Sequence, residues 1–212
     1  MEKNQGLKSI MAVILGLIAG AILMAVMGFN PLEGYEFLFK GGLMNLERIG
    51  NTIATATPLM LTGLSVAFAF KTGLFNIGAP GQMLFGGFCS IAVGLSLDLP
   101  KMILVPIVVL AGILGGALWA TVPGVLKAKF NVHEVVSSIM MNWVAYWIVY
   151  YNIPKYFKGE FLETESKMLS DSATLKASWL SNIFEGSYIN LGIFLAMIAV
   201  FIVWFILNKT VL

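Results

Sequence analysis

The chain has 212 residues, of which 58% are hydrophobic and 11% charged, and its formal net charge is +2. Soluble domains carry about 25% charged residues because their surfaces must stay hydrated, and one core cannot bury this much apolar side chain. The composition therefore predicts a polytopic membrane protein, and the small charge gives no reason to expect nucleic acid as a partner.

Six apolar stretches follow one another, each about as long as a helix that crosses the hydrocarbon core. They are continuous rather than alternating, which favours helices over barrel strands as the way to pair every backbone group in lipid. We therefore expect an all-α transmembrane bundle of about six spanning helices and a single integral membrane domain over residues 1–212. The expected spans are Ser9–Phe29, Thr52–Phe70, Gln82–Leu97, Met102–Leu126, Val135–Tyr151 and Tyr188–Leu207.

We expect the first stretch to be a helix that stays in the protein, because it is longer than the apolar region of a signal peptide and no cleavage site follows it. It indicates an N-terminus on the cytoplasmic side. The positive residues on that side lie close to helix ends, where they set orientation best, whereas the opposite side dilutes its lysines in a long acidic loop. The inner positives are Lys3, Lys8, Lys71, Lys127, Lys129 and Lys209.

Two connections are longer than ordinary turns. Asn30–Asn51 mixes apolar and charged residues and predicts a short interfacial helix on the outer face. Asn152–Ser187 is the longest polar stretch and contains Trp179, a residue type that anchors proteins at membrane interfaces. Either anchoring and packing or a binding role fits this second loop, since binding residues often lie on loops.

The stretch from Thr57 to Gly87 is interrupted by polar and helix-breaking residues near positions 71–82. Asn76 and Gln82 offer amide donors and acceptors there, and Pro80 removes a backbone donor. Broken backbone at membrane depth is tolerated where it is buried in protein or lines a cavity. The pattern fits a broken or re-entrant segment, and it also fits a short cytoplasmic turn between two spanning helices.

A second informative turn joins the fourth and fifth stretches. Lys127 and Lys129 end one helix near its negative dipole end, and Glu134 lies in the first turn of the next helix. Asn131 suits a turn or cap between them. His133 is the only histidine, and the loop lacks partners for it to bind a metal, so we expect no metal site.

Polar and small residues inside the later stretches have two interpretations. Asn142 lies deep enough to need a partner, as helix–helix contact or as lining of a solute path. Cys89 is expected to be a small buried hydrophobe. A glycine series in the fourth stretch predicts close helix packing and consists of Gly112, Gly115, Gly116 and Gly124.

These segments resemble the permease subunits of the branched-chain amino acid, ribose and nucleoside ABC importer family, most of all its nucleoside and simple-sugar branch. The first block that carries the resemblance is Pro58-Leu59, Thr62-Gly63-Leu64, Ala67-Phe68-Ala69-Phe70, Gly73-Leu74-Phe75-Asn76-Ile77-Gly78 and Gly81-Gln82. The second is Gly116-Ala117-Leu118-Trp119-Ala120, Pro123-Gly124, Leu126-Lys127-Ala128-Lys129, Val132 and Glu134-Val135-Val136-Ser137-Ser138-Ile139-Met140-Met141-Asn142. Permeases of this family continue beyond the point that matches Leu212, so the chain is similar to their N-terminal portion.

The resemblance implies a permease in the plasma membrane of a bacterium that conducts a small polar solute, a nucleoside before a simple sugar or branched-chain amino acid, into the cell. It implies four kinds of partner: an ABC ATPase subunit, a second permease subunit in a homo- or heterodimer, an extracellular solute-binding lipoprotein, and membrane lipid. The chain itself is expected to hold no cofactor, because the ATPase subunit uses the ATP.

Two sets of residues are expected to serve that function. Hydrogen bonds to a ribose and stacking on a base point to a substrate pathway formed by Phe75, Asn76, Gln82, Asn142 and Trp143. The helix–loop–helix of the second block, which alone would be a well-capped turn, suggests contact with the ATPase through Lys127, Lys129, His133 and Glu134.

Missing groups narrow the alternatives. No acidic residue, arginine or histidine lies in the middle of an expected span, as a proton-driven carrier usually requires, and no Walker-type loop is present. The spans also lack a nucleophile triad or a carboxylate pair, so we do not expect an enzyme. A stand-alone secondary transporter or channel, and a membrane scaffold that transports nothing, remain the rival classes.

Overall fold

The computed structural model describes residues 5–160, 162 and 165–209 of the chain. Their regular structure is helical, apart from one isolated bridge between Lys158 and Ser166, which confirms the all-α prediction. The elements are α1 (Gln5–Val26), α2 (Pro31–Leu43), α3 (Leu46–Lys71), α4 (Ala79–Ser96), α5 (Lys101–Phe130), α6 (Glu134–Tyr156), the 3₁₀ turn η2 (Asp171–Ala173), α7 (Ser178–Ile183) and α8 (Gly192–Lys209).

Six of these helices correspond to the six expected spans, and four of the six are long and apolar enough to cross a membrane: α3, α4, α5 and α8. The apolar part of α1 is shorter, Ile10–Val26, and α6 does not reach the same length of apolar sequence. Large apolar side chains face outward along the bundle, as on α5, where Leu110, Leu114 and Leu118 are 56%, 60% and 66% exposed. Water would penalise such a surface and lipid does not, so the chain is a multi-pass membrane protein.

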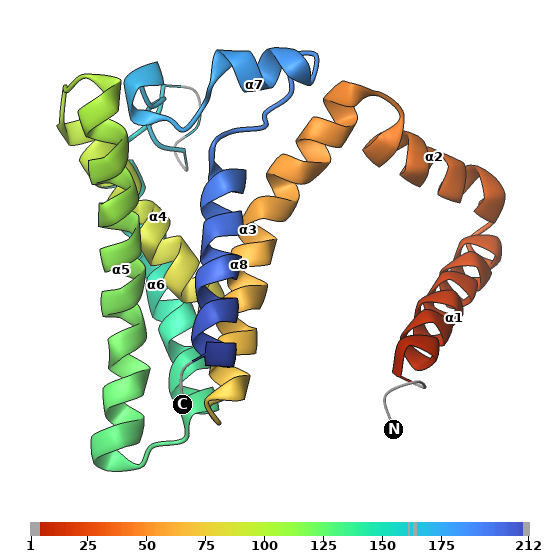
Figure 1. The fold of residues 1–212 in the computed structure, drawn as a ribbon, viewed down its shortest axis with the longest axis horizontal. Helices are drawn as coiled ribbons and strands as arrows, with labels where there is room; N and C mark the ends of the chain where they lie inside the picture. The colour runs from red at the N-terminus through yellow and green to blue at the C-terminus, as the bar shows by residue number, and fades with distance from the viewer. Residues whose placement is uncertain (1–4, 161, 163–164, 210–212) are drawn as a thin grey trace.

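The helices run up and down the bundle in turn (Figure 1). The loop between α3 and α4 and the turn between α5 and α6 lie at the end of the molecule where α1 starts and α8 finishes. Helices α2 and α7 lie at the opposite end. The two motifs singled out in the sequence, residues 71–82 and 127–134, therefore share one end of the bundle.

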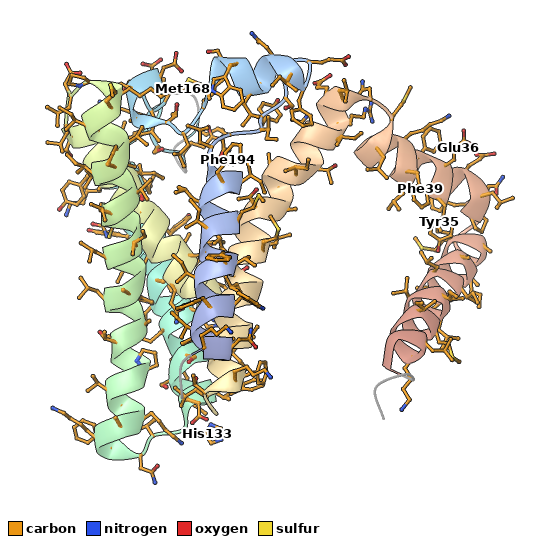
Figure 2. The ribbon with its side chains drawn as sticks, viewed as in Figure 1. Tyr35, Glu36, Phe39, His133, Met168 and Phe194 are labelled. Atoms are coloured by element: carbon orange, nitrogen blue, oxygen red, sulfur yellow. The ribbon has the colours of Figure 1, made fainter. Side chains whose placement is uncertain are left out.

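The outer connection 30–51 forms a helix, as expected, but it ends earlier than the sequence suggested. Asn45 caps α3 by accepting a hydrogen bond from the Arg48 N–H at 2.9 Å, so α3 starts at Leu46 rather than Thr52. Helix α2 crosses from α1 to α3, and α1 stands apart from the remaining helices (Figure 1). On α2, Glu36 points to the outer face, whereas Tyr35 and Phe39 point toward the inner side of the arch (Figure 2).

Helices α4 and α5 form the closest pair in the bundle. A Cβ atom on Gly86 would lie 2.7 Å from the carbonyl oxygen of Gly112, and one on Gly115 would lie 2.7 Å from the Cys89 sulfur. Only glycine allows this approach. The predicted packing role is thus confirmed for Gly112, Gly115 and Gly116. It is wrong for Gly124, where an added Cβ atom would meet no atom of another described element within 4 Å.

The remaining contacts divide the bundle into two units. Helix α6 packs on α4 and α5, and the Trp119 indole N–H donates to the Met141 carbonyl at 3.2 Å. Helix α3 packs chiefly on α8 and touches α4 at only a few positions. At the far end the Tyr188 N–H, just before α8, donates to Asn51 Oδ1 on α3 at 2.8 Å, and the η2 turn of the long loop packs on α5. That contact supports the packing interpretation of the loop, whose first residues, up to Tyr156, belong to α6.

Candidate functional site

The break between α3 and α4 has a clear local cause. Gly73 adopts a φ of +78°, and the Leu74 N–H turns back to the Ala69 carbonyl at 2.9 Å, which ends α3 in a glycine cap. Helix α4 starts at Ala79 with Pro80 in its first turn, where a missing N–H costs nothing. Residues 72–78 are therefore non-helical, as predicted, and lie at the end of the bundle.

Two amide side chains organise this loop from within. The Asn76 Nδ2 group donates to Gln82 Oε1 at 3.3 Å, and Gln82 Nε2 donates back to Asn76 Oδ1 at 3.2 Å. Asn76 Oδ1 also accepts the Gly78 N–H at 2.9 Å, and Asn76 Nδ2 reaches Ser65 Oγ on α3 at 3.3 Å. We call Asn76 and Gln82 the amide pair. Both side chains are partly exposed, so a solute could exchange with some of these bonds.

Asn142 attaches the loop to α6. Its Nδ2 group donates to the Ile77 carbonyl at 3.0 Å, and its Oδ1 atom accepts the Gly81 N–H at 2.9 Å. The Gly81 N–H belongs to the first turn of α4, where no earlier carbonyl of the helix can accept it. A single side chain thus satisfies two backbone groups of the broken segment. Of the two roles that the sequence allowed for Asn142, this is the contact between helices rather than the lining of a pathway.

A cavity of about 300 Å³ opens beside the amide pair. Its walls come from the α3–α4 loop and from the adjoining ends of α5 and α6. Most of the lining is apolar, with a few polar groups from each side, as is usual for small-molecule sites. The lining residues that carry the chemistry are Phe75, Asn76, Gln82, Lys127, Glu134 and Ser138.

The five predicted pathway residues therefore separate into groups. Phe75, Asn76 and Gln82 line the cavity together, and the Phe75 ring meets the Phe70 ring edge-on at 4.8 Å between centroids. Asn142 holds the loop from behind. Trp143 is 61% exposed on the outward face of α6, in a stripe of rings with Tyr146, and does not line the cavity.

The turn between α5 and α6 carries the residues expected to contact an ATPase. Asn131 ends α5 in the left-handed region, with φ of 52°, which confirms its role as a cap. Lys127 Nζ lies 2.9 Å from Glu134 Oε2 across the turn. The hydrogen bond from the Lys127 ammonium lowers the pKa of the Glu134 carboxyl. His133 is exposed at this end of the molecule (Figure 2), and Lys129 is exposed in the last turn of α5.

The structure brings together part of each set. Lys127 and Glu134 line the same cavity as Phe75 and the amide pair, whereas Lys129 and His133 do not line it. Sequence reasoning missed Ser65 altogether. Its signal was present, because Ser65 is the one polar residue in the run Gly63–Phe70, and a lone hydroxyl in an apolar span has to find a partner.

The chain is similar to several known proteins. It is 41% identical to the guanosine ABC transporter permease protein NupP of Bacillus subtilis over 95% of this chain, and 37% identical to the nucleoside ABC transporter permease protein NupB of Lactococcus lactis over 96%. It is 30% identical to the glucose ABC transporter permease protein TsgB13 of Haloferax volcanii over 95%. The chain spans a little over half the length of these relatives, 57%, 57% and 54%.

No solved protein structure matches the chain. A family model does match, over residues 48–212, and it describes the branched-chain amino acid transport system permease component. The match covers everything from the first turn of α3 through α8, including both blocks that surround the cavity. The chain therefore belongs to the family of branched-chain amino acid transport system permease components.

Proposed function

We propose that the chain is part of the permease subunit of an ABC importer that conducts a nucleoside into the cell. The observation that carries the proposal is its likeness, over nearly its whole length, to two permeases named for guanosine and for nucleosides. The cavity beside the amide pair supports the proposal, because it combines amide groups with an aromatic ring.

In this proposal the amide pair recognises the hydroxyls or the base edge of the nucleoside. Each amide offers both donors and an acceptor, so exchanging the internal bond for bonds to a solute leaves no group unpaired. Phe75 offers a ring face for the base, since stacking on an aromatic side chain tolerates different bases. Asn142 positions the loop, and Trp143 faces the bundle exterior.

The same proposal assigns partners. An ABC ATPase subunit uses the ATP and contacts the turn at Lys127, Lys129, His133 and Glu134. A second permease subunit, identical or not, completes the pathway, and an extracellular solute-binding lipoprotein delivers the solute. The chain lies in the plasma membrane of a bacterium with its N-terminus in the cytoplasm. It is a transport subunit and not an enzyme.

A simple sugar is the second candidate solute, and a specific observation favours it: one relative is a permease named for glucose. A sugar shares the hydroxyl groups of a nucleoside but has no base to stack. The two candidates therefore differ in their need for the Phe75 ring. Replacing Phe75 with leucine should impair nucleoside transport and spare sugar transport.

The experiment that tests the proposal is uptake of labelled guanosine by cells with and without the full-length gene, in competition with ribose and with leucine. We expect deletion of the gene to abolish an ATP-dependent uptake that neither competitor reduces. Unchanged guanosine uptake after deletion would overturn the choice of solute. Uptake that survives removal of the ATPase subunit would favour a stand-alone transporter. A stable protein without any uptake phenotype would favour a scaffold.

A further inference from the structure

A second cavity, of about 440 Å³, lies between α3 and α5, over α4. We call it the α3–α5 groove. It adjoins the first cavity, because Gln82 and Ala120 line both. The amide pair therefore stands where the two spaces meet, and the groove extends from there along α3 between Ser65 and Pro58 and along α5 between Ala120 and Gly112.

The groove exists because of how the helices are paired. Helix α3 packs on α8, and α5 packs on α4, so α3 and α5 face each other across a gap. The α5 wall of the groove is formed largely by small residues, Gly112, Gly116, Ala117 and Ala120. Small side chains on a wall of this kind leave space that larger ones would fill. On the α3 side, Pro58 lines the groove and interrupts the backbone hydrogen bonds of its helix.

Two hydroxyl groups face this space from α3. Ser65 Oγ accepts the hydrogen bond from Asn76 Nδ2, so its own hydrogen can be donated to another acceptor. Thr62 donates to the Pro58 carbonyl at 3.0 Å, which leaves the lone pairs of its oxygen to accept. Ser65 thus offers a donor, Thr62 an acceptor and Gln82 an amide, all between apolar walls. These groups suit a small solute with hydroxyl groups on a ring.

We propose that the α3–α5 groove is a second solute subsite, in which Ser65 and Thr62 bind hydroxyl groups of the solute before or after it passes the amide pair. The proposal rests on the proposed import function and adds to it a second chamber and two residues that determine specificity. The amide pair then separates two solute-filled spaces rather than closing a single one.

The first test uses the full-length permease with its partner subunits in membrane vesicles. In a background in which Cys89 and any further cysteine of the full-length permease are replaced by serine, Ser65→Cys is treated with methyl methanethiosulfonate, with and without guanosine. We expect guanosine to slow modification of the new thiol and leucine at the same concentration to leave it unchanged. Equal rates with and without guanosine would overturn the subsite. So would a thiol that never reacts, because a solute route must admit a reagent this small.

The second test fills the groove and compares a neighbouring residue on the same helix. Ala117→Phe places a ring in the groove, whereas Leu118→Phe changes a side chain that faces away from the bundle and is 66% exposed. We expect the first variant to lose most guanosine uptake and the second to keep it, at equal protein levels. Ser65→Ala should reduce uptake about fivefold, as expected for one hydrogen bond to the solute.

The outcomes separate the subsite from the function on which it rests. If the unmodified permease does not import guanosine, the proposed function fails first. If it imports guanosine while Ala117→Phe and Ser65→Ala do so equally well, the function stands and the groove is only a space that a lipid chain fills.

Discussion

The side-chain oxygen of Asn142 accepts the Gly81 N–H at 2.9 Å, so a residue in the middle of α6 caps the first turn of α4. The same amide donates to the Ile77 carbonyl, and the two bonds fix the broken segment that carries the amide pair. The ends of α3 and α4 hold the loop on either side, and α6, which is far away in the sequence, holds it as well.

We expect Asn142→Leu to destabilise the protein by about 2–4 kcal/mol, because two backbone groups of the loop lose their partner. Asn152→Leu is the matched control, since Asn152 lies on the same helix and, among the residues that the structure describes, bonds the Ile148 carbonyl one turn earlier and no second element. Thermal unfolding of the full-length protein in detergent measures both changes. Equal losses of stability in the two variants would contradict the special role of Asn142.

Helix α4 contains two adjacent glycines, Gly86 and Gly87, at which replacement by alanine should have opposite effects on stability. Gly86→Ala should destabilise the bundle, because the new Cβ would lie 2.7 Å from the backbone oxygen of Gly112, which cannot move as a side chain can. Gly87→Ala should be neutral or stabilising by up to about 1 kcal/mol, because its Cβ meets no other described residue within 4 Å and alanine favours the helix. The apparent Tm of each variant measures the two effects. Similar Tm values for the two variants would show that α4 and α5 separate easily.

Replacing either member of the amide pair should lower transport without lowering the amount of protein. Asn76→Ala and Gln82→Ala each leave the other amide without its reciprocal partner and remove donors and acceptors from the cavity wall. The measurement is guanosine uptake, normalised to the permease present in the membrane. Met140→Ala, at an exposed position of α6, is the control. Unchanged uptake in both amide variants would remove the pair from the pathway.

The ion pair between Lys127 and Glu134 can be separated from a direct role of Lys127 at the ATPase. If the pair mainly braces the turn, Lys127→Glu and Glu134→Lys should each reduce ATP-driven uptake, and the double exchange should restore most of it. If Lys127 contacts the ATPase itself, the double exchange should stay as defective as the single Lys127→Glu variant. Uptake in vesicles containing the ATPase subunit distinguishes these results.

The same pair sets a pH dependence whose direction follows from the lowered pKa of Glu134. A carboxyl with a lowered pKa stabilises the fold above its unfolded value, about 4.3 for glutamate, and loses that contribution as the pH falls through its folded pKa. The stability difference between the wild type and Glu134→Gln should therefore be constant from neutral pH to about pH 5 and shrink only below it. A difference that already changes near pH 7 would point to another group.

Composition and local signals in the sequence predicted the fold class and the elements. Continuous apolar runs sufficed for the helices, and the glycine and proline residues around position 76 marked the break between α3 and α4. The start of α3 was misplaced because the cap at Asn45 depends on a side-chain bond within the charged outer connection, where the sequence predicted a short interfacial helix. Spacing alone also did not separate Gly124 from Gly116, because it does not say which part of α5 another helix covers.

The site was only partly predictable, because it depends on which helices face each other. Asn76, Gln82 and Phe75 stood out as polar and aromatic residues beside a break, and they share one cavity. That Lys127 and Glu134 line the same cavity as these residues follows from the packing of α5 and α6 on α4, which spacing along the chain does not specify. Ser65 and the groove beside it follow from the pairing of α3 with α8, a contact remote in sequence.

The division of the bundle into α4–α5–α6 and α3–α8 has a mechanical consequence. Within each unit the helices are closely packed, whereas α3 touches α4 at few positions, and the amide pair and the groove lie along that boundary. Rocking of one rigid body against the other would widen or narrow the boundary while each interior keeps its packing. The contact between α3 and α4 is thus a sparse one that has the amide pair at one end, so a small rotation there would change the space beside the pair without repacking either unit.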